Sequence, residues 1–499
     1  MTSASSKKFR QAQSRPSFPL KTGQLFINNE FCDATEGRKT DVIDPATENV
    51  LVQVAEANEQ DTKNAITVAR QAFEQGHWQQ MSGYERSKIL WRIGDLILEN
   101  GEELAFLQAK EMGRLYTSSM EIDIPFLSSL YHYYAGLVTN IEGSVKQVVN
   151  DAHVYTRQEP LGVVAAITPF NIPLILAACK FAPALTAGNT IVHKPASSTP
   201  LSALKMAEII RDAGTPPGVF NVVTGPSSVA SRLLSSHPDI EKVAITGSIS
   251  SGVRIIKSSA NTVKHLTMEL GGKCVNIVFA DADLEMVGDI AYHSMFSKGE
   301  ICSGGSRMLV ERSVYEDVIE RIKQKMESLK IGNPLDPEVK VGPVASKTEY
   351  ANFIHYTNVG CADGARLVTG GKPFNTRTGK GYYVEPTIFA DVQQSMTIAQ
   401  EETLGAILVI IPFNTFEEAI DIANASQYGL AAAVHSSDFG KAQKATAQLE
   451  AGVVWVNTYG QFDVSIPFGG YKMSGYGKAF GRESLQHYLQ SKTVWLNWK

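Results

Sequence analysis

Short runs of branched apolar residues alternate with amphipathic stretches through the middle of the chain. Five such runs have the length and the Val and Ile content of buried parallel strands: 163–167, 190–193, 220–223, 242–245 and 275–279. In one intervening stretch, 199–213, apolar residues such as Leu201, Leu204 and Ile209 recur at helical spacing, and Gly214 follows as a stop signal. The alternation predicts a parallel sheet covered by helices, of the kind that binds nucleotides.

The segments on either side of this region extend the pattern. Residues 60–138 place apolar side chains at helical spacing, and we expect them to be mainly helical. After Gly271, strand and helix patterns resume at 308–329 and 406–456, which is enough for a second α/β domain with its boundary near Leu270. Two large domains also agree with the length, because 499 residues exceed the roughly 250 to 300 of a single hydrophobic core.

Two further segments, 143–159 and 486–498, alternate polar and apolar residues in the manner of half-buried strands. They lie far apart in the sequence and outside both runs of alternating strands and helices. We expect them to form a small outlying sheet.

Composition excludes several classes of protein. Apolar residues make up 43% and charged residues 19%, the balance of a globular chain, and the net charge of −5 is spread without long runs, which gives nucleic acid no basic footprint. The longest apolar region, 161–192, is interrupted by Pro169, Lys180 and Pro183 and cannot form an uninterrupted membrane span of about 20 residues. We expect neither a nucleic-acid partner nor a membrane partner.

The five cysteines are odd in number and widely spread, without the close pairs of a zinc site, so we expect a reducing compartment, the cytoplasm, and no metal. Residues 1–21 are basic, rich in serine and free of acids, which a transit peptide to an organelle would share. A flexible N-terminal tail is the interpretation we prefer for them.

Cys302 lies in the stretch Gly299-Glu300-Ile301-Cys302-Ser303-Gly304-Gly305, where the glycines allow a tight turn and backbone amides could face a developing oxyanion. A thiol nucleophile suits such a loop. Taken alone, however, a cysteine is more often a small buried apolar residue than a catalytic one.

Two other residues have the chemistry to assist a nucleophile. Glu269 ends a predicted strand just before Gly271 and Gly272, so its carboxylate could act as a general base, although a solvated glutamate in a turn is an equally ordinary outcome. Asn171 follows the strand 163–167 between two prolines, and its side-chain amide could donate to an oxyanion.

Lys194 and the tripeptide Thr246-Gly247-Ser248 end two other predicted strands, at the edge where open parallel sheets bind ligands. Each signal is weak alone, because a lysine at a strand end is more often solvated than bound to a ligand. Together with Glu401-Glu402 and Pro467-Phe468-Gly469-Gly470, these elements resemble, in order and spacing, the aldehyde dehydrogenase superfamily over nearly the whole chain.

The resemblance implies an α/β fold: a Rossmann-like cofactor-binding domain, an α/β catalytic domain and a small β oligomerisation element, with a dimer or tetramer as the assembly. The implied division is a flexible tail at 1–21, the cofactor-binding domain at 22–142 and 160–270, the catalytic domain at 271–470, and the oligomerisation element at 143–159 and 471–499.

The resemblance also implies a mechanism for NAD(P)-dependent, hydrolytic oxidation of an aldehyde. Cys302 attacks the aldehyde, its backbone amide and the Asn171 side chain stabilise the oxyanion, and a thioester remains after hydride transfer. Glu269 then activates water as general base. Relatives that transfer the acyl group to coenzyme A usually lack a glutamate at this position. Lys180 belongs to a proton relay whose usual glutamate is replaced here by Ala479.

The cofactor residues that the resemblance implies line the predicted strand ends and the start of the helix that follows Ser248, whose amino end favours phosphate. They are Ile167, Thr168, Pro169, Phe170, Lys194, Ser197, Gly225, Gly247, Ser248, Gly252, Leu270, Glu402 and Leu404. Two depart from the family pattern. Ser197 stands where members that prefer NAD often carry a glutamate that repels a 2'-phosphate, so NAD or NADP is expected; Leu404 replaces a phenylalanine.

The substrate tunnel implied by the resemblance is apolar and partly aromatic. Its residues are Ile172, Leu176, Cys179, Ile301, Ser303, Tyr459, Phe462 and Phe468. Cys179 replaces a tryptophan found in relatives that prefer small aldehydes, which favours a medium or large apolar aldehyde, aromatic or long aliphatic. The alternative interpretation is that these residues pack in the hydrophobic core and do not line a tunnel.

Two other functions remain open from the sequence. One is a cysteine-dependent hydrolase or esterase without redox chemistry, which needs a histidine beside Cys302; the nearest in sequence is His293. The other is a structural homologue that has lost catalysis. Both leave the cofactor residues without a role.

Overall fold

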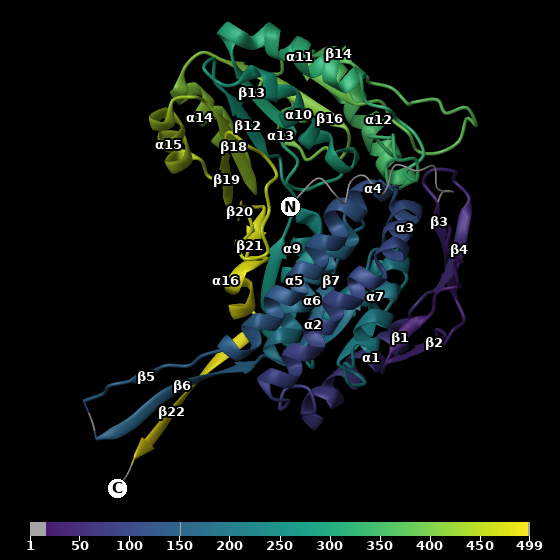
Figure 1. Ribbon diagram of the computed structural model, residues 1–499, viewed down its shortest axis with the longest axis vertical. Helices are drawn as coiled ribbons and strands as arrows, with labels where there is room; N and C mark the ends of the chain where they lie inside the picture. Colours follow the sequence, from purple (N-terminus) through teal and green to yellow (C-terminus); the bar gives the residue numbers. More distant parts are fainter. Residues whose placement is uncertain (1–15, 150, 498–499) are drawn as a thin grey trace.

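The computed structural model describes residues 16–149 and 151–497. Two large sheets, set one above the other in Figure 1, form the body, and a narrow ribbon of strands projects from it. The upper sheet is built mostly from the second half of the chain and the lower one mostly from the first. Of the predicted N-terminal tail, residues 1–15 lie outside the described part, and residues 16–21 form no helix or strand.

The lower sheet has eight strands in the order β2-β1-β9-β8-β7-β10-β11-β21. The five strands from β9 to β11 are parallel, whereas β2, β1 and β21 are joined antiparallel at the edges. The strands are β1 (Leu25–Ile27), β2 (Glu30–Cys32), β7 (Val163–Ile167), β8 (Thr190–Lys194), β9 (Phe220–Val222), β10 (Lys242–Thr246), β11 (His265–Glu269) and β21 (Gly475–Tyr476).

Helices cover both faces of this sheet, because alternate residues of its central strand point to opposite sides. Val163 and Ala165 of β7 pack under α1, α8 and α9, whereas Val164 and Ala166 pack under α2, α5, α6 and α7. The helices are α1 (Glu59–Gln75), α2 (Gly83–Glu99), α3 (Gly101–Met112), α4 (Tyr116–Ser118), α5 (Ile124–Leu137), α6 (Pro173–Ala187), α7 (Leu201–Asp212), α8 (Ser227–Ser236) and α9 (Ile249–Ser259).

The upper sheet has seven strands in the order β14-β15-β16-β13-β12-β18-β19, all parallel to their neighbours except β14. The strands are β12 (Val275–Val278), β13 (Arg307–Glu311), β14 (Arg366–Thr369), β15 (Thr387–Ala390), β16 (Ile407–Phe413), β18 (Ala431–His435) and β19 (Val453–Val456). The helices around it are α10 (Val287–Met295), α11 (Tyr315–Glu327), α12 (Lys347–Ala362), α13 (Thr397–Gln400), α14 (Phe416–Asn424) and α15 (Phe439–Gln448).

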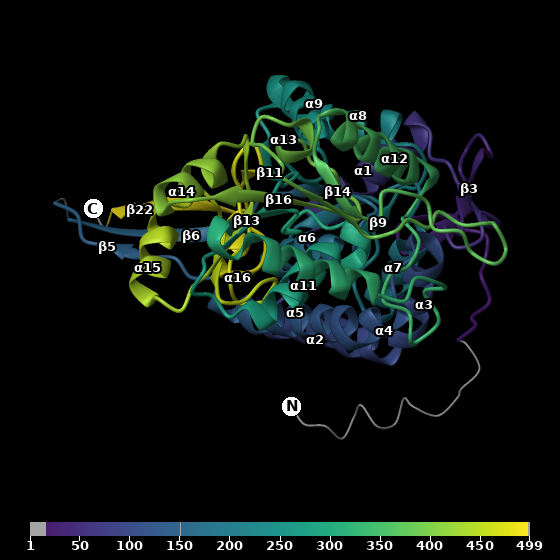
Figure 2. The same cartoon turned by 90° about the horizontal axis from the view of Figure 1, so that it is seen from above.

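The projecting ribbon is a three-stranded sheet, seen in both Figure 1 and Figure 2. β22 (Leu489–Asn497) pairs antiparallel with β6 (Ala152–Pro160) over its whole length, and β5 (Val145–Lys146) extends the sheet. The predicted outlying sheet is therefore confirmed. The remaining elements are the antiparallel pair β3 (Lys39–Ile43) and β4 (Val50–Ala55), the pair β17 (Tyr428–Gly429) and β20 (Tyr471–Lys472), and α16 (Gly481–Gln486).

The strand pairing corrects two expectations. The run 275–279 was grouped with the first sheet, but β12 belongs to the second one, and the fifth parallel strand of the first sheet is β11. Segment 471–499 does not lie in the ribbon as a whole, since β21 adds to the edge of the first sheet and only β22 joins the ribbon. The division into domains stays a prediction. Among the described residues, no helix combines the length and apolar character needed to span a bilayer.

Candidate active site

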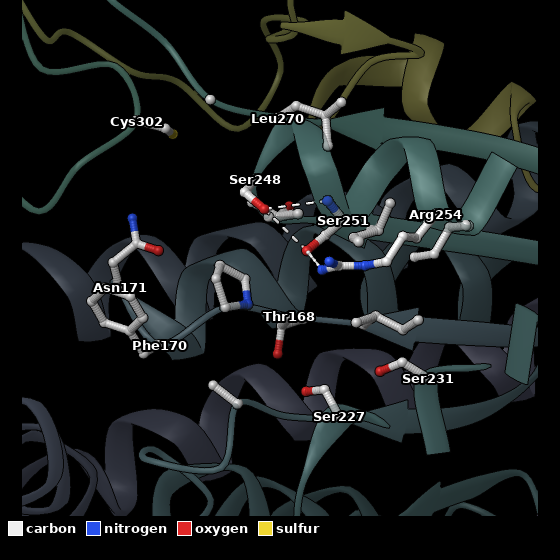
Figure 3. A pocket seen from close by; sticks show the side chains of 18 of the residues that line it. Thr168, Phe170, Asn171, Ser227, Ser231, Ser248, Ser251, Arg254, Leu270 and Cys302 are labelled. Atoms are coloured by element: carbon white, nitrogen blue, oxygen red, sulfur yellow. Dashed lines mark hydrogen bonds between the residues drawn. The ribbon is translucent and has the colours of Figure 1, made fainter. Parts of the chain in front are cut away.

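A cavity of about 1200 Å³ opens at the carboxyl ends of the parallel strands β7, β10 and β11. Its size suits a ligand larger than an ordinary small substrate. Twelve residues predicted from the sequence line it: Ile167, Thr168, Pro169, Phe170, Asn171, Ser197, Gly247, Ser248, Leu270, Cys302, Glu402 and Leu404. Figure 3 shows Cys302 and Asn171 together at one end, with α9 and the serines of α8 leading away from them. The predicted catalytic and cofactor residues therefore share one cavity.

The loop that carries Cys302 is held by a buried ion pair that the sequence reasoning missed. Lys298 lies 2.7 Å from the Glu300 carboxylate, and both side chains are buried. Lys298 also donates to the carbonyl of Met112, and Glu300 accepts from the backbone amide of Ala345 at 2.9 Å. Because breaking a buried pair leaves an uncompensated charge, this pair holds the loop firmly. Its only sequence signal is a Lys-Gly-Glu spacing beside the cysteine.

The Cys302 thiol is poorly placed to ionise unaided. Burial raises its pKa above the ordinary value, and the carboxylates of Glu402 and Glu269 raise it further. Cys274 lies under the loop, with its thiol 3.5 Å from the Cys302 carbonyl. A base is needed to generate the thiolate.

Glu269 ends β11, where Gly475 of β21 pairs with it. Its side chain is buried, and within the described chain neither carboxylate oxygen has a hydrogen-bond partner. Burial raises its pKa to about 8, and the ammonium groups of Lys180 and Lys478 oppose that rise. A carboxylate without donors, titrating near neutral pH, has the properties of a general base.

Asn171 is fixed by the turn from β7 into α6. Ile172 adopts a left-handed conformation with φ of 46°, which a branched residue rarely does, and Pro173 begins the helix. The Asn171 side chain is buried at the same end of the cavity as Cys302. One turn of strained backbone thus aims this amide into the site.

Lys180 lies deeper in α6 and is buried. Its ammonium donates to the Thr246 hydroxyl at 2.6 Å and to the Leu176 carbonyl at 3.2 Å. Ala479, at the position of the missing relay glutamate, packs in the apolar core and exchanges backbone hydrogen bonds with Phe468. Lys180 acts on Glu269 through its charge, but the chain offers no carboxylate at position 479.

Ser248 caps α9: its hydroxyl accepts from the Ser251 amide at 3.3 Å. Gly252 lies one turn further on, where a β-carbon would come within 2.7 Å of the Leu270 side chain, so the glycine lets this cavity residue pack against the helix. Ser248 and Ser251 both line the cavity, so the start of α9, whose first amides suit an anion, forms part of its wall.

Ser197 and Gly225, predicted separately, are in contact: the serine hydroxyl donates to the Gly225 carbonyl at 2.9 Å. Lys194, also predicted as a cofactor residue, is not among the residues that line the cavity. Its ammonium is fully buried and donates to the Pro195 carbonyl at 2.5 Å, and burial lowers its pKa to about 7. In this structure Lys194 supports the turn beneath the cavity.

Glu402 and Leu404, in the segment between α13 and β16, line the same cavity as Cys302. Glu402 accepts from the Gly272 amide at 3.0 Å, and burial raises its pKa to about 7. At Gly271 a β-carbon would come within 2.1 Å of the Glu402 carboxylate, so the glycine admits this side chain to the site.

The eight predicted substrate residues lie outside the lining of this cavity. Ile172, Cys179, Ser303 and Tyr459 are buried, Leu176, Ile301 and Phe468 are half-buried, and Phe462 is 41% exposed. The aromatic members are grouped. The ring centroids of Phe462 and Phe468 lie 5.5 Å apart, and the Trp455 ring contacts the rings of both Tyr459 and Phe462. The Tyr459 hydroxyl donates to the Ser303 carbonyl at 2.6 Å, which ties this cluster to the Cys302 loop.

Sequence reasoning missed the polar lining at the far end of the cavity. Serines and cations of α8 and α9 face each other there: Ser227, Ser228, Ser231, Arg232, Ser235, Ser251, Arg254, Lys257 and Ser258. They carry no motif, and only the pairing of the two helices across the cavity brings them together.

Comparison with known proteins supports the resemblance on which the site was predicted. The family model described as "Aldehyde dehydrogenase family" matches residues 31–494. Aldehyde dehydrogenase 1 of Tanacetum cinerariifolium is 43% identical over 96% of this chain and 95% of its own. A structure of aldehyde dehydrogenase from Bacillus cereus superposes with a TM-score of 0.94, at 41% identity over 96% of this chain and 97% of its own.

A betaine aldehyde dehydrogenase from Staphylococcus aureus, solved in complex with NAD+, gives a TM-score of 0.93 at 36% identity and covers 95% of each chain. The predicted fold class is confirmed by these structures.

Proposed function

Because this chain belongs to the aldehyde dehydrogenase family, we propose that it oxidises a medium or large apolar aldehyde to the carboxylic acid, with NAD or NADP as oxidant. The observation that carries the proposal is the meeting of Cys302 and Asn171 at one end of a cavity whose wall contains a capped helix start. Glu269 lies close enough to influence the thiol electrostatically.

Cys302 forms the first bond. With its proton removed, its sulfur attacks the aldehyde carbon, the carbonyl electrons move to oxygen, and a thiohemiacetal oxyanion results. The Asn171 side-chain amide and the Cys302 backbone amide donate to that oxygen. The cofactor, when bound, supplies an acceptor for the hydride that leaves this carbon, and a thioester remains on the sulfur.

Glu269 performs the second half of the reaction. Its ionised carboxylate takes a proton from water, the hydroxide adds to the thioester carbon, and the C–S bond breaks to release the acid and the thiolate. Burial without hydrogen-bond donors keeps the carboxylate basic enough for this step. Acid formation that required coenzyme A would contradict this role.

The residues around the cavity fit a nicotinamide dinucleotide. The amides at the start of α9 are suited to the pyrophosphate, and Glu402 is suited to a ribose near Cys302. The Ser231 hydroxyl is buried in the cavity and has no hydrogen-bond partner among the described residues, as expected where a ligand supplies one.

Ser197 supports use of either cofactor, because it places no negative charge beside the adenosine ribose. We expect Ser197→Glu to depress turnover with NADP more than with NAD. Initial rates with both cofactors test this, with Ser437→Glu, an exposed serine outside the cavity, as the control. Equal effects on both cofactors would contradict the placement of Ser197.

The aromatic cluster around Phe462 and Phe468 supports an apolar substrate. A panel with reduced-cofactor absorbance as the readout should give the highest kcat/KM with aromatic and long aliphatic aldehydes. A preference for betaine aldehyde or succinate semialdehyde would contradict this substrate class. No signal with any aldehyde and either cofactor would contradict the dehydrogenase function itself.

The alternative hydrolase lacks support from the cavity, since the described residues lining it include no histidine. His293 instead lies near Gly460, with its ring nitrogen 3.9 Å from where a β-carbon would be. Without a histidine to activate the thiol, hydrolysis without redox chemistry has no base other than Glu269. A homologue without catalysis would give no turnover while still binding cofactor.

For the assembly we propose a dimer or tetramer formed through the ribbon, which exposes Val145, Trp495 and Leu496 on a sheet too narrow to bury them itself. Light scattering that showed only monomer would contradict this assembly.

We propose the cytoplasm as the location, because the five cysteines are unpaired, as is usual in a reducing compartment.

A further inference from the structure

The outward face of α2 presents a row of apolar side chains far from the cavity. Tyr84, Trp91 and Leu98 recur every seven residues, and they are 66%, 51% and 51% exposed. The row extends for about 21 Å along the helix axis. Figures 1 and 2 show α2 and α5 in the outer layer of helices on the lower sheet. Single exposed apolar residues are ordinary, but three large ones aligned on one helix are typical of an interaction surface.

Two charged residues complete this row. Lys88, which is exposed, lies between Tyr84 and Trp91, and Asp95, which is half-buried, lies between Trp91 and Leu98. The five positions are therefore separated by four, three, four and three residues. This is the spacing with which one helix packs along another, so we call these five residues the α2 seam.

The central residue of the α2 seam is held in place before any second molecule binds. The Trp91 ring stacks on His132 of α5, with the ring centroids 4.2 Å apart and the planes inclined by 22°. His132 is fixed in turn, because its Nε2 lies 3.0 Å from the Asp95 carboxylate. A tryptophan that is already ordered loses little conformational entropy on binding, and tryptophan is among the residues that most often dominate the affinity of an interface.

The charges of the α2 seam match a second copy of the same seam in antiparallel orientation. Around a twofold axis at Trp91, positions at similar distances before and after this residue face each other across the two copies. Tyr84 then faces Leu98 of the partner subunit, and Lys88 faces Asp95 of the partner subunit. A parallel pair would place Lys88 against Lys88 and Asp95 against Asp95, which is unfavourable for like charges.

Charges beside the α2 seam do not oppose this pairing. Arg92, the flanking residue nearest the axis, is already paired with Glu99 of the same helix at 2.6 Å. The Glu85 carboxylate accepts from the Ser82 hydroxyl at 2.8 Å at the start of α2. The flank nearest the axis therefore brings little net charge to it.

We propose that the α2 seam is a self-association face, through which two copies of this chain bind each other around a twofold axis at Trp91. The face is separate from the ribbon, so it joins copies that the ribbon does not. One helix face is smaller than the roughly 800 Å² that each partner buries in a standard interface, and we expect a dissociation constant in the micromolar range.

Sedimentation velocity of the full-length protein, between about 1 and 300 µM, measures this association. Trp91→Glu should weaken it at least about 30-fold and give smaller assemblies than wild type at the same concentration. Leu367→Glu is the matched control, because Leu367 is also an exposed apolar residue but lies on β14; it should leave the assembly unchanged. Urea unfolding shows that each variant is folded. Equal sizes of wild type and Trp91→Glu at every concentration would overturn the proposal.

A charge exchange tests the antiparallel orientation. Lys88→Glu and Asp95→Lys each place like charges opposite each other across the axis, so each should weaken the association about 3- to 10-fold. The double variant Lys88→Glu/Asp95→Lys restores opposite charges and should recover the affinity of wild type. A double variant as weak as either single variant would overturn the pairing. The measurement needs neither aldehyde nor cofactor, so its result is independent of the proposed function.

Discussion

Replacing Glu269 with glutamine should stabilise the protein while it abolishes turnover. The carboxylate is buried, and within the described chain its oxygens accept no hydrogen bond, so the folded state strongly favours its protonated form. Glutamine has nearly the same shape and no charge to bury. Turnover should fall about 100- to 10,000-fold, the usual contribution of a general base.

The stability effect has a magnitude set by the pKa. Folding raises the pKa of Glu269 from 4.5 to about 8. At about 1.4 kcal/mol for each pH unit, this difference corresponds to about 5 kcal/mol. Between these pH values the folded protein holds a proton that the unfolded chain has released, so wild-type stability falls as pH rises from 4.5 to about 8 and this loss ends above it.

Urea unfolding followed by tryptophan fluorescence at pH 5, 7 and 8.5 measures the effect. The Glu269→Gln variant should gain stability relative to wild type by an amount that grows with pH and reaches a plateau above about pH 8. The cost of burying the uncharged amide, about 1 to 3 kcal/mol, is the same at each pH and cancels from the comparison.

Glu121→Gln serves as the control, since Glu121 is exposed. It should shift the free energy of unfolding by less than about 0.5 kcal/mol at every pH. A difference between wild type and Glu269→Gln that stayed constant from pH 5 to 8.5 would refute the reasoning, because it would mean that the carboxylate is as solvated in the folded protein as in the unfolded chain.

Two other substitutions test how the site is held. Asn171→Ala should lower kcat about 100- to 1,000-fold with little change in the affinity for cofactor, measured by fluorescence titration, because the lost donor acts on the oxyanion; an equal loss of cofactor affinity would indicate a collapsed turn instead. Glu300→Gln should destabilise the protein by about 3 kcal/mol in urea unfolding, because it leaves the Lys298 ammonium buried without its partner; an unchanged midpoint would show that the pair does not hold the loop.

The parallel strands could be predicted from the sequence because each is a short run of Val and Ile buried on both faces. β7 was predicted at its observed bounds, and β8, β9 and β10 to within a residue. The residue pattern of a strand does not, however, predict which other strands pair with it. The run 275–279 looks the same in either sheet, and only the pairing of β12 with β13 and β18 places it in the second one.

The meeting of Cys302 and Asn171 in one cavity could be predicted because each residue lies in a local motif, whereas the polar lining at the far end of the cavity could not be predicted. Arg254 and Ser231 lie on different helices, and nothing near either in the sequence distinguishes it from a solvated side chain. Lys194 ends β8, as its place in the sequence predicted, and its buried ammonium donates to the Pro195 carbonyl, while its role toward the cofactor stays a prediction. Side-chain direction at a strand end depends on packing that no local pattern encodes.

Position 479, where the resemblance implies a relay glutamate beside Glu269, is occupied by Ala479, which is buried and has no ionisable group. Lys478 is a second cation, besides Lys180, near the Glu269 carboxylate. Its ammonium, 3.1 Å from the Gly469 carbonyl, helps to lower the pKa of Glu269 against the effect of burial. Lys478→Met should therefore raise that pKa and move the rising limb of the kcat profile, expected near pH 8 in wild type, to higher pH with the same plateau. A uniform loss of kcat at every pH would instead assign Lys478 to packing alone.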